Sequence, residues 1–216
     1  MKLPWTLRSP EPLTPLEGYE RWSSTYNVES NPIKNLSNEL VRKFLPDLAG
    51  KRMFDAGCGT GLFCTLAESF GAAGILGLDL SPAMINEARK NCQRTEFVVG
   101  DLENTQLTAE AFDVVVCALV LGHIKNLRAA IQILASATKA GGTLIITDFH
   151  PFLSLRNNKR TFTDASSSKT YEIIHHTHLL SEYFEALTGS GMRLVSIEEP
   201  MWENIPVVFG MCCVKN

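Results

Sequence analysis

The feature that most constrains the fold of this chain is the stretch Lys51-Arg-Met-Phe-Asp-Ala-Gly-Cys-Gly-Thr-Gly61. Met53 and Phe54 predict the end of a short buried strand, and apolar residues at helical spacing continue to Phe70, with Thr60 as the expected N-cap. Three glycines allow a tight turn and leave the backbone open to a ligand. These glycines are Gly57, Gly59 and Gly61. A strand, a glycine loop and a helix N-terminus are how α/β proteins build a nucleotide site.

The spacing of the glycines distinguishes between nucleotide classes. A dinucleotide fingerprint, G-x-G-x-x-G, needs a glycine where this chain has Leu62. The pattern is instead Asp-x-Gly-x-Gly-x-Gly, and its acid is Asp55. A carboxylate there would repel a pyrophosphate, but it suits a ligand that carries an ammonium and a sulfonium group. S-adenosylmethionine is such a ligand, and the alternative is a glycine-rich turn that binds nothing.

The segment Phe54-Asp-Ala-Gly-Cys-Gly-Thr-Gly61 closely resembles the first motif of the class I methyltransferases that use S-adenosylmethionine. The resemblance extends from about residue 50 to the end of the chain, and it is closest to the small-molecule branch with the ubiquinone- and menaquinone-pathway enzymes. It implies S-adenosylmethionine as the cofactor. It also implies methyl transfer by in-line displacement to an oxygen, nitrogen or carbon atom of a small-molecule acceptor.

From Lys51 onward, predicted strands and helices alternate, which favours an α/β fold with a largely parallel sheet and helices on both faces. After the first strand, strands are expected at 74–79, 97–99, 112–118, 143–148, 192–197 and 207–214. Helices are expected at 62–70, from Ser81, at 126–139 before Gly141-Gly142, and at 179–187. Seven strands that end in a hairpin match the doubly wound, Rossmann-like sheet of class I methyltransferases, whose last strand is antiparallel.

The chain is expected to divide into residues 1–30 and one methyltransferase domain at 31–216, which begins with a helix at 32–45. Residues 1–18 are rich in proline and predict an extended arm. Residues 151–178 are polar, with a possible strand at 171–174. We expect this insertion after the fifth strand to form a lid or a substrate-side hairpin.

A short aromatic helix is predicted at 18–26, with Tyr19, Trp22 and Tyr26 on one face. The resemblance implies that this helix is a lid whose aromatic residues close over the methionine end of the cofactor. The alternative is a structural helix that packs Trp22 on the sheet.

Acids follow successive predicted strands at the edge where a nucleotide would bind. Asp79 ends the second strand, and its carboxylate can accept hydrogen bonds from both ribose hydroxyls. Leu80 and Met84 would then contact the adenine. The alternative for Asp79 is an exposed strand end or a helix cap.

Asp101 follows the third strand, and the resemblance implies that it binds the adenine amine while the backbone amide of Leu102 contacts a ring nitrogen. An Asp after a Gly is also an ordinary turn residue. Ala118 begins the loop after the fourth strand, which the resemblance places near the methionine end of the cofactor.

All five histidines lie between positions 123 and 178. His150 follows the fifth strand and is the first candidate for a general base, with His123 second and the cluster His175, His176 and His178 third, represented by His175. Structural imidazoles are the alternative for each. No metal is expected, because methyl transfer from a sulfonium needs none.

Composition excludes several classes of function. A formal net charge of −3 and scattered basic residues argue against nucleic acid or an acidic membrane as a partner. The six cysteines form no C-x-x-C pair, and neither a signal sequence nor a run of transmembrane length is present, so we expect free thiols and a cytoplasmic location. Oligomeric state stays open. Two rival functions remain, a non-catalytic S-adenosylmethionine-binding or interaction protein and a nicotinamide-dependent oxidoreductase.

Overall fold

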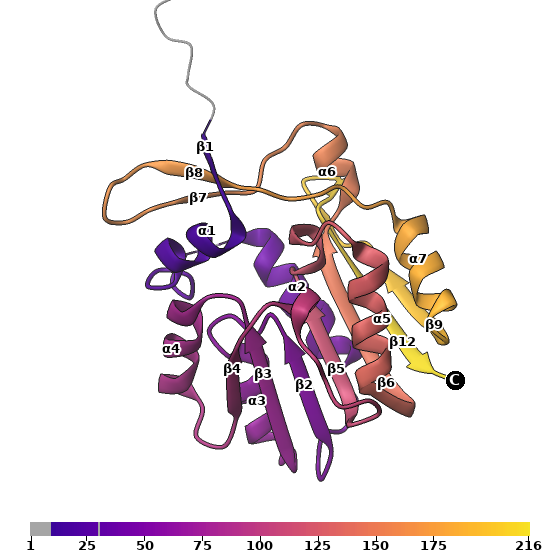
Figure 1. Ribbon diagram of the computed structural model, residues 1–216. Coiled ribbons are helices and arrows are strands. Elements are labelled where there is room, and N and C mark those ends of the chain that lie inside the picture. The colour runs from indigo at the N-terminus through magenta and orange to yellow at the C-terminus, as the bar shows by residue number, and fades with distance from the viewer. Residues whose placement is uncertain (1–9, 30) are drawn as a thin grey trace, which may run out of the picture.

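The structure is a computed structural model that describes residues 10–29 and 31–216. Its main element is a seven-stranded sheet of order β4-β3-β2-β5-β6-β12-β9 (Figure 1). The strands are Arg52–Ala56 (β2), Gly74–Asp79 (β3), Glu96–Val99 (β4), Phe112–Ala118 (β5), Thr138–Phe149 (β6), Met192–Glu198 (β9) and Val208–Lys215 (β12). Only β12 runs antiparallel to its neighbours, β6 and β9. The predicted seven-stranded, mostly parallel sheet with an antiparallel last strand is therefore confirmed.

Helices cover both faces of this sheet (Figure 1). They are Pro32–Phe44 (α2), Leu62–Ser69 (α3), Pro82–Asn91 (α4), Leu127–Ala137 (α5) and Leu180–Gly189 (α7). Along β5, Val115 and Cys117 pack in the core beside α5 and α7, whereas Val114 and Val116 pack in the core with α2, α3 and α4. Because side chains alternate along a strand, a fully apolar strand is buried on both faces.

A second, smaller sheet crosses the upper edge of the main sheet in Figure 1. It contains Glu11–Leu13 (β1), Thr161–Thr163 (β7) and Thr170–Ile173 (β8), with β1 parallel to β8. The part of the predicted arm that the structure describes, residues 10–18, therefore contains a strand paired with the insertion and the first turn of a helix rather than an extended segment alone. The insertion also contains Pro151–Leu155 (α6), and the hairpin of Met201–Trp202 (β10) and Ile205–Pro206 (β11) precedes β12.

The aromatic helix lies earlier in the chain than the sequence pattern predicts. It is α1, Pro15–Trp22, and it begins with a capping box in which Thr14 and Glu17 bond each other's backbone. Tyr26 consequently lies in the turn after the helix. Trp22 is buried against Phe162 of β7, with ring centroids 5.2 Å apart, and so packs in the small sheet rather than on the main one.

Two other boundaries differ from expectation. Gly61, at φ 83°, is the N-cap of α3, and Thr60 instead donates its hydroxyl proton to Asn27 Oδ1 at 2.7 Å. The helix expected to continue to residue 139 ends at Ala137, because Thr138 already pairs with Phe112 in the sheet. The two glycines at 141 and 142 lie within β6 and do not end the helix.

None of the helices in the described part of the chain is long and apolar enough to span a membrane. Within residues 10–29 and 31–216, no three His, Cys, Asp or Glu side chains come together as metal ligands.

Replacing Phe162 with Ala tests whether the small sheet is a separate packing unit. Phe162 is buried between Trp22 and Tyr171, so its loss should cost about 3 kcal/mol locally. Hydrogen exchange should accelerate in residues 11–13 and 161–173 and stay unchanged in β2 to β6. Phe152→Ala is the matched control, because Phe152 is 41% exposed. Equal loss of protection in the main sheet would show that the two sheets unfold together.

Candidate active site

A cavity of about 260 Å³ opens at the carboxyl ends of β2, β3, β4 and β5, under α1. Most of the residues predicted to bind a cofactor line it. They are Tyr19, Tyr26, Gly57, Gly59, Asp79, Leu80, Met84, Asp101, Leu102 and Ala118, together with His123. Trp22, Asp55, Gly61, His150 and His175 do not line it. The roles of all these residues stay predictions, but the structure brings the first group to one cavity, which we call the first cavity.

The glycine loop is tied to the neighbouring strand by backbone hydrogen bonds. The amides of Gly57 and Cys58 both donate to the carbonyl oxygen of Leu78, at 2.7 and 2.9 Å. Gly57 has φ 74°, and a Cβ on it would lie 2.2 Å from Val120 Cγ2. The loop therefore needs glycine here both for its conformation and for the close approach of the loop after β5.

Asp79 holds the loop from the end of β3. Its Oδ2 accepts from the Gly59 amide at 2.8 Å, and its Oδ1 accepts from the Ser81 amide at 2.9 Å. Burial raises the pKa of Asp79. Each carboxylate oxygen keeps a second lone pair, so the residue can also accept from the two hydroxyls of a ribose. Asp101, whose carboxylate accepts from the Glu103 amide at 3.0 Å, lies on the same wall.

Asp55 lies beneath the glycine loop instead of facing the first cavity. It is 1% exposed, and its Oδ2 accepts a hydrogen bond from the Cys64 thiol at 3.5 Å. Burial raises the pKa of Asp55 to about 7. An attraction between this carboxyl group and a cationic ligand would therefore act through the loop and not by contact.

The helix α1 is joined to the mouth of the first cavity by Glu20, which the sequence pattern does not single out. Glu20 Oε1 accepts from the Ser81 hydroxyl at 2.6 Å and from the Ala83 amide at 2.9 Å. A carboxylate is favoured at this place, because the amides at the N-terminus of α4 carry partial positive charge. The contact spans more than sixty residues, so no local signal predicts it.

A second cavity, of about 410 Å³, lies on the other side of Tyr19 and Tyr26. Both cavities share these tyrosines and Leu119. Its other walls come from α2, the end of β6, β7 and the β10–β11 hairpin. Two adjoining cavities with a shared aromatic wall suit two ligands whose reacting atoms meet at Tyr19 and Tyr26.

His123 lies at this junction in a network of partly buried polar groups. Its Nε2 accepts from the Tyr19 hydroxyl at 3.0 Å and from Arg160 Nη1 at 2.9 Å, while its Nδ1 donates to the Ile174 carbonyl at 3.0 Å. We assign this tautomer because a carbonyl can only accept and a guanidinium can only donate. Burial, then the nearby guanidinium of Arg160, lowers the pKa of His123 well below its usual range. A neutral imidazole whose one acceptor nitrogen is already occupied by a hydroxyl and a guanidinium is a poor general base.

Arg160 is the main residue that sequence reasoning missed. Its Nη2 donates to Asp148 Oδ1 at 2.9 Å, and its guanidinium lies over the ring of Phe149 at 5.2 Å. Asp148 is 1% exposed and also accepts from the Gly122 amide at 2.6 Å. The sequence places Arg160 in the polar insertion, but no spacing rule pairs an insertion residue with the end of a strand.

His150, the first candidate for a general base, is a helix cap. Its Nδ1 accepts from the Phe152 amide at 3.1 Å, and its Nε2 donates to Glu199 Oε1 at 2.8 Å. It lines neither cavity. Pro151 at the first helical position is the signal that predicts a cap at 150. The geometry does not favour His150 as the base.

The three remaining histidines also lie outside the two cavities. His175 Nε2 bonds the Ser154 hydroxyl at 3.1 Å, and burial lowers the pKa of His175. The His176 amide donates to the Gly122 carbonyl at 2.6 Å, and His178 Nε2 donates to the Ile124 carbonyl at 2.8 Å. His176 and His178 thus fix the loop that carries His123, whereas His175 bonds α6.

Comparison with known proteins agrees with this geometry. The methyltransferase domain family matches residues 54–146. A protein of Haemophilus influenzae with no assigned function is 28% identical over 69% of this chain and 64% of its own length. The demethylmenaquinone methyltransferase of Tropheryma whipplei is 32% identical over 50% of this chain and 46% of its own length. The chain thus spans less than two thirds of these relatives.

Among solved structures, a protein of Listeria monocytogenes described as an S-adenosylmethionine-dependent methyltransferase superposes with a TM-score of 0.73. It is 21% identical, and the superposition covers 85% of this chain and 99% of that one. The chain therefore has the fold of an S-adenosylmethionine-dependent methyltransferase. Residues 54–146 are the part that the methyltransferase domain family matches, and S-adenosylmethionine is the cofactor of the similar Listeria enzyme. The glycine loop, Asp79 and the first cavity fit that cofactor.

Gly57→Ala should damage the site more than backbone strain alone would. Gly71 has the same φ of 74° as Gly57 but open space around it, so Gly71→Ala measures the strain, about 1 kcal/mol. Gly57→Ala adds the clash with Val120 and should cost at least twice as much in denaturant unfolding. An equal decrease in the free energy of unfolding of the two variants would show that the loop after β5 moves away from the new methyl group without a measurable loss of stability.

His123 should stay neutral where an ordinary histidine becomes charged. Its pKa is lowered in the folded protein, so it favours the folded state at neutral pH, and this contribution fades as pH falls below the ordinary value of about 6.5. Its ring proton resonances should not move between about pH 8 and about pH 6. The urea-unfolded protein is the control, in which the same ring should titrate. If the His123 resonances of the folded protein moved halfway at a pH near the ordinary histidine pKa of about 6.5, that would contradict the partly buried network.

Proposed function

We propose that the protein transfers a methyl group from S-adenosylmethionine to an oxygen, nitrogen or carbon atom of a small-molecule acceptor. The observation that carries the proposal is the pair of cavities that meet at Tyr19 and Tyr26. The first has the glycine loop and the carboxylates of Asp79 and Asp101 on its walls, and the second has room for a small molecule.

Bound S-adenosylmethionine would supply an activated methyl group on a sulfonium. The protein itself then needs to position the acceptor against that methyl group and to exclude water. Asp79 would accept the ribose hydroxyls, and Met84 and Leu102 would enclose the adenine. The Glu20 contact holds α1 closed over the first cavity. Tyr19 and Tyr26 would form the wall through which the acceptor meets the methyl group.

Two rivals make different predictions. A non-catalytic S-adenosylmethionine-binding protein would keep the first cavity but show no turnover, and a nicotinamide oxidoreductase would bind NAD. Incubation with S-adenosylmethionine labelled in its methyl group and a panel of small acceptors separates the first rival from an enzyme. Labelled product together with S-adenosylhomocysteine supports the proposal. Thermal stabilisation by NAD but not by S-adenosylhomocysteine would overturn it.

Asp79→Ala should weaken S-adenosylhomocysteine binding by on the order of 2–4 kcal/mol, because two charge-assisted hydrogen bonds to the ribose are lost. Calorimetry measures the affinity, and denaturant unfolding checks that the variant is folded. The matched control is Asp47→Ala, which removes a carboxylate that caps only the Ala49 amide. Equal affinities for the wild type and Asp79→Ala would remove Asp79 from the site.

A further inference from the structure

We propose that the second cavity binds an acceptor whose reacting oxygen is already ionised at neutral pH, a carboxylate or a phosphonate, and that Arg160 binds this charge. The inference rests on the proposed function, which it deepens by naming the substrate class. Two sets of observations carry it: the cations on the walls of the cavity, and the absence of a competent base among the described residues of the junction.

The cations are Lys34, Lys159 and Arg160, and the cavity wall carries one carboxylate, that of Glu203. Arg160 and Lys159 have ion-pair partners, Asp148 and Glu172, but neither partner lines the cavity. The carboxylates therefore lie behind the cations, and the cavity presents N–H donors. Of the five N–H groups of Arg160, the bonds to Asp148 and His123 use two, so donors remain for a ligand.

Lys34 adds a charge that no carboxylate balances directly. Its ammonium donates to the carbonyl oxygens of Tyr26 and Glu29 and lies 4.6 Å from the centre of the Tyr26 ring. Within residues 10–29 and 31–216, no carboxylate oxygen lies within 4.0 Å of it. A bound anion would supply that missing negative charge.

The residues at the junction are poorly suited to take a proton. Burial raises the pKa of Tyr19 to about 12 and that of Tyr26 also, so both hydroxyls keep their protons. His123 is held neutral, and its unprotonated nitrogen, Nε2, already accepts from Arg160 and Tyr19. Burial lowers the pKa of Lys34, but its ammonium donates to two carbonyl oxygens, and these bonds favour the charged form. Glu203 is exposed on the turn of the β10–β11 hairpin.

This arrangement discriminates among acceptor oxygens. A phenol with an ordinary pKa near 10 is ionised to only about one part in a thousand at neutral pH, so its transfer needs a base. A carboxylic acid with a pKa near 4 is ionised to more than about 99% and needs none. In the transfer, one oxygen of the anion forms the bond to the methyl carbon while the bond from that carbon to sulfur breaks. The electron pair stays on sulfur, which becomes a neutral thioether, the acceptor loses one negative charge, so that a carboxylate becomes a neutral ester, and no proton moves.

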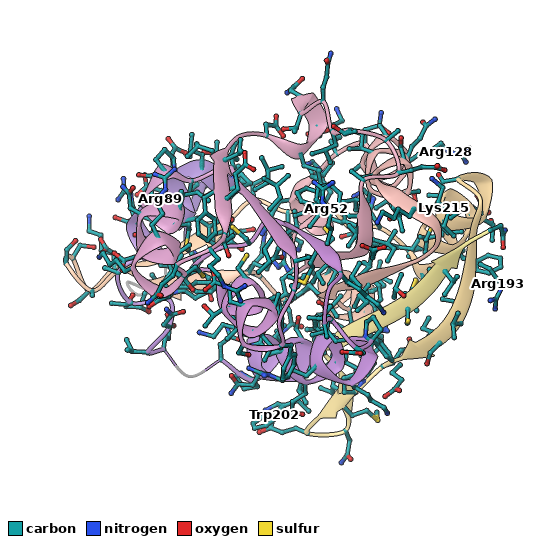
Figure 2. The ribbon with its side chains drawn as sticks, turned by 90° about the horizontal axis from the view of Figure 1, so that it is seen from below. Arg52, Arg89, Arg128, Arg193, Trp202 and Lys215 are labelled. Carbon is teal, nitrogen blue, oxygen red and sulfur yellow. The ribbon has the colours of Figure 1, made fainter. Side chains whose placement is uncertain are left out.

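The remaining wall suits an apolar or aromatic body attached to the anion. Trp22 and Phe149 line the cavity, and Trp202 of the hairpin does so while it is 49% exposed. Figure 2 shows Trp202 at the edge of the molecule, far in that view from the labelled arginines Arg89 and Arg128. A planar ring could stack against such side chains. Benzoate and phenylphosphonate are therefore suitable probes, and benzamide is the neutral match.

Calorimetric titration of the full chain with these three probes tests the inference. Benzoate or phenylphosphonate should bind at least about tenfold more tightly than benzamide, because charge-assisted hydrogen bonds are lost in the amide. Whichever anion binds more tightly shows whether the cavity prefers a carboxylate or a phosphonate. Arg160→Gln should remove most of that preference, and Arg156→Gln, an exposed arginine of the same insertion that lines neither cavity, should keep it.

Benzamide binding as tightly as the anions, equal preference in the two arginine variants, or no binding of either anion would overturn the inference. If Arg160→Gln does not fold because Asp148 loses its partner, Lys34→Gln replaces it, and an unchanged anion preference there would count against the inference. Titration with S-adenosylhomocysteine separates the two levels of the argument. Its failure to bind the wild type would sink the proposed function, whereas its binding without anion binding would sink only this inference.

Discussion

The hydrogen bonds between the glycine loop and the end of β3 are the constraint on which the rest of the site depends. Two loop amides share the carbonyl oxygen of Leu78, and a third reaches Asp79. They fix the loop at the edge of two adjacent parallel strands, where side chains from several strands converge. The same Asp79 also bonds the Ser81 amide before α4, so loop and helix start share one carboxylate.

Closure of the site comes from parts of the chain that are distant in sequence. Glu20 reaches α4 from the N-terminal helix, and Arg160 reaches Asp148 and His123 from the insertion after β6. One contact sits beside the first cavity and the other beside the second. In both contacts a charged side chain of a covering segment, either α1 or the insertion after β6, forms hydrogen bonds with polar groups next to the main sheet. The two segments are therefore held over the site by electrostatic as well as apolar contacts.

The sheet and the first cavity were predictable because their signals are local. Gly57, Asp79 and Asp101 are recognisable by their position after apolar strands, and the structure brings all three to one cavity. The acceptor side was not predictable in the same way. His150 has a suitable position along the chain, but Pro151 makes it a cap, and the role of Arg160 depends on a pairing that no period in the sequence encodes.

The pairing of β1 with β8 links the two covering segments through backbone hydrogen bonds. The strand β1 leads directly into α1, and β8 pairs with β7, which Arg160 directly precedes. Neither segment can swing outward alone without breaking these bonds. Exchange of the two ligands would then be governed by one common opening event, and a steady-state analysis should find their release coupled rather than independent.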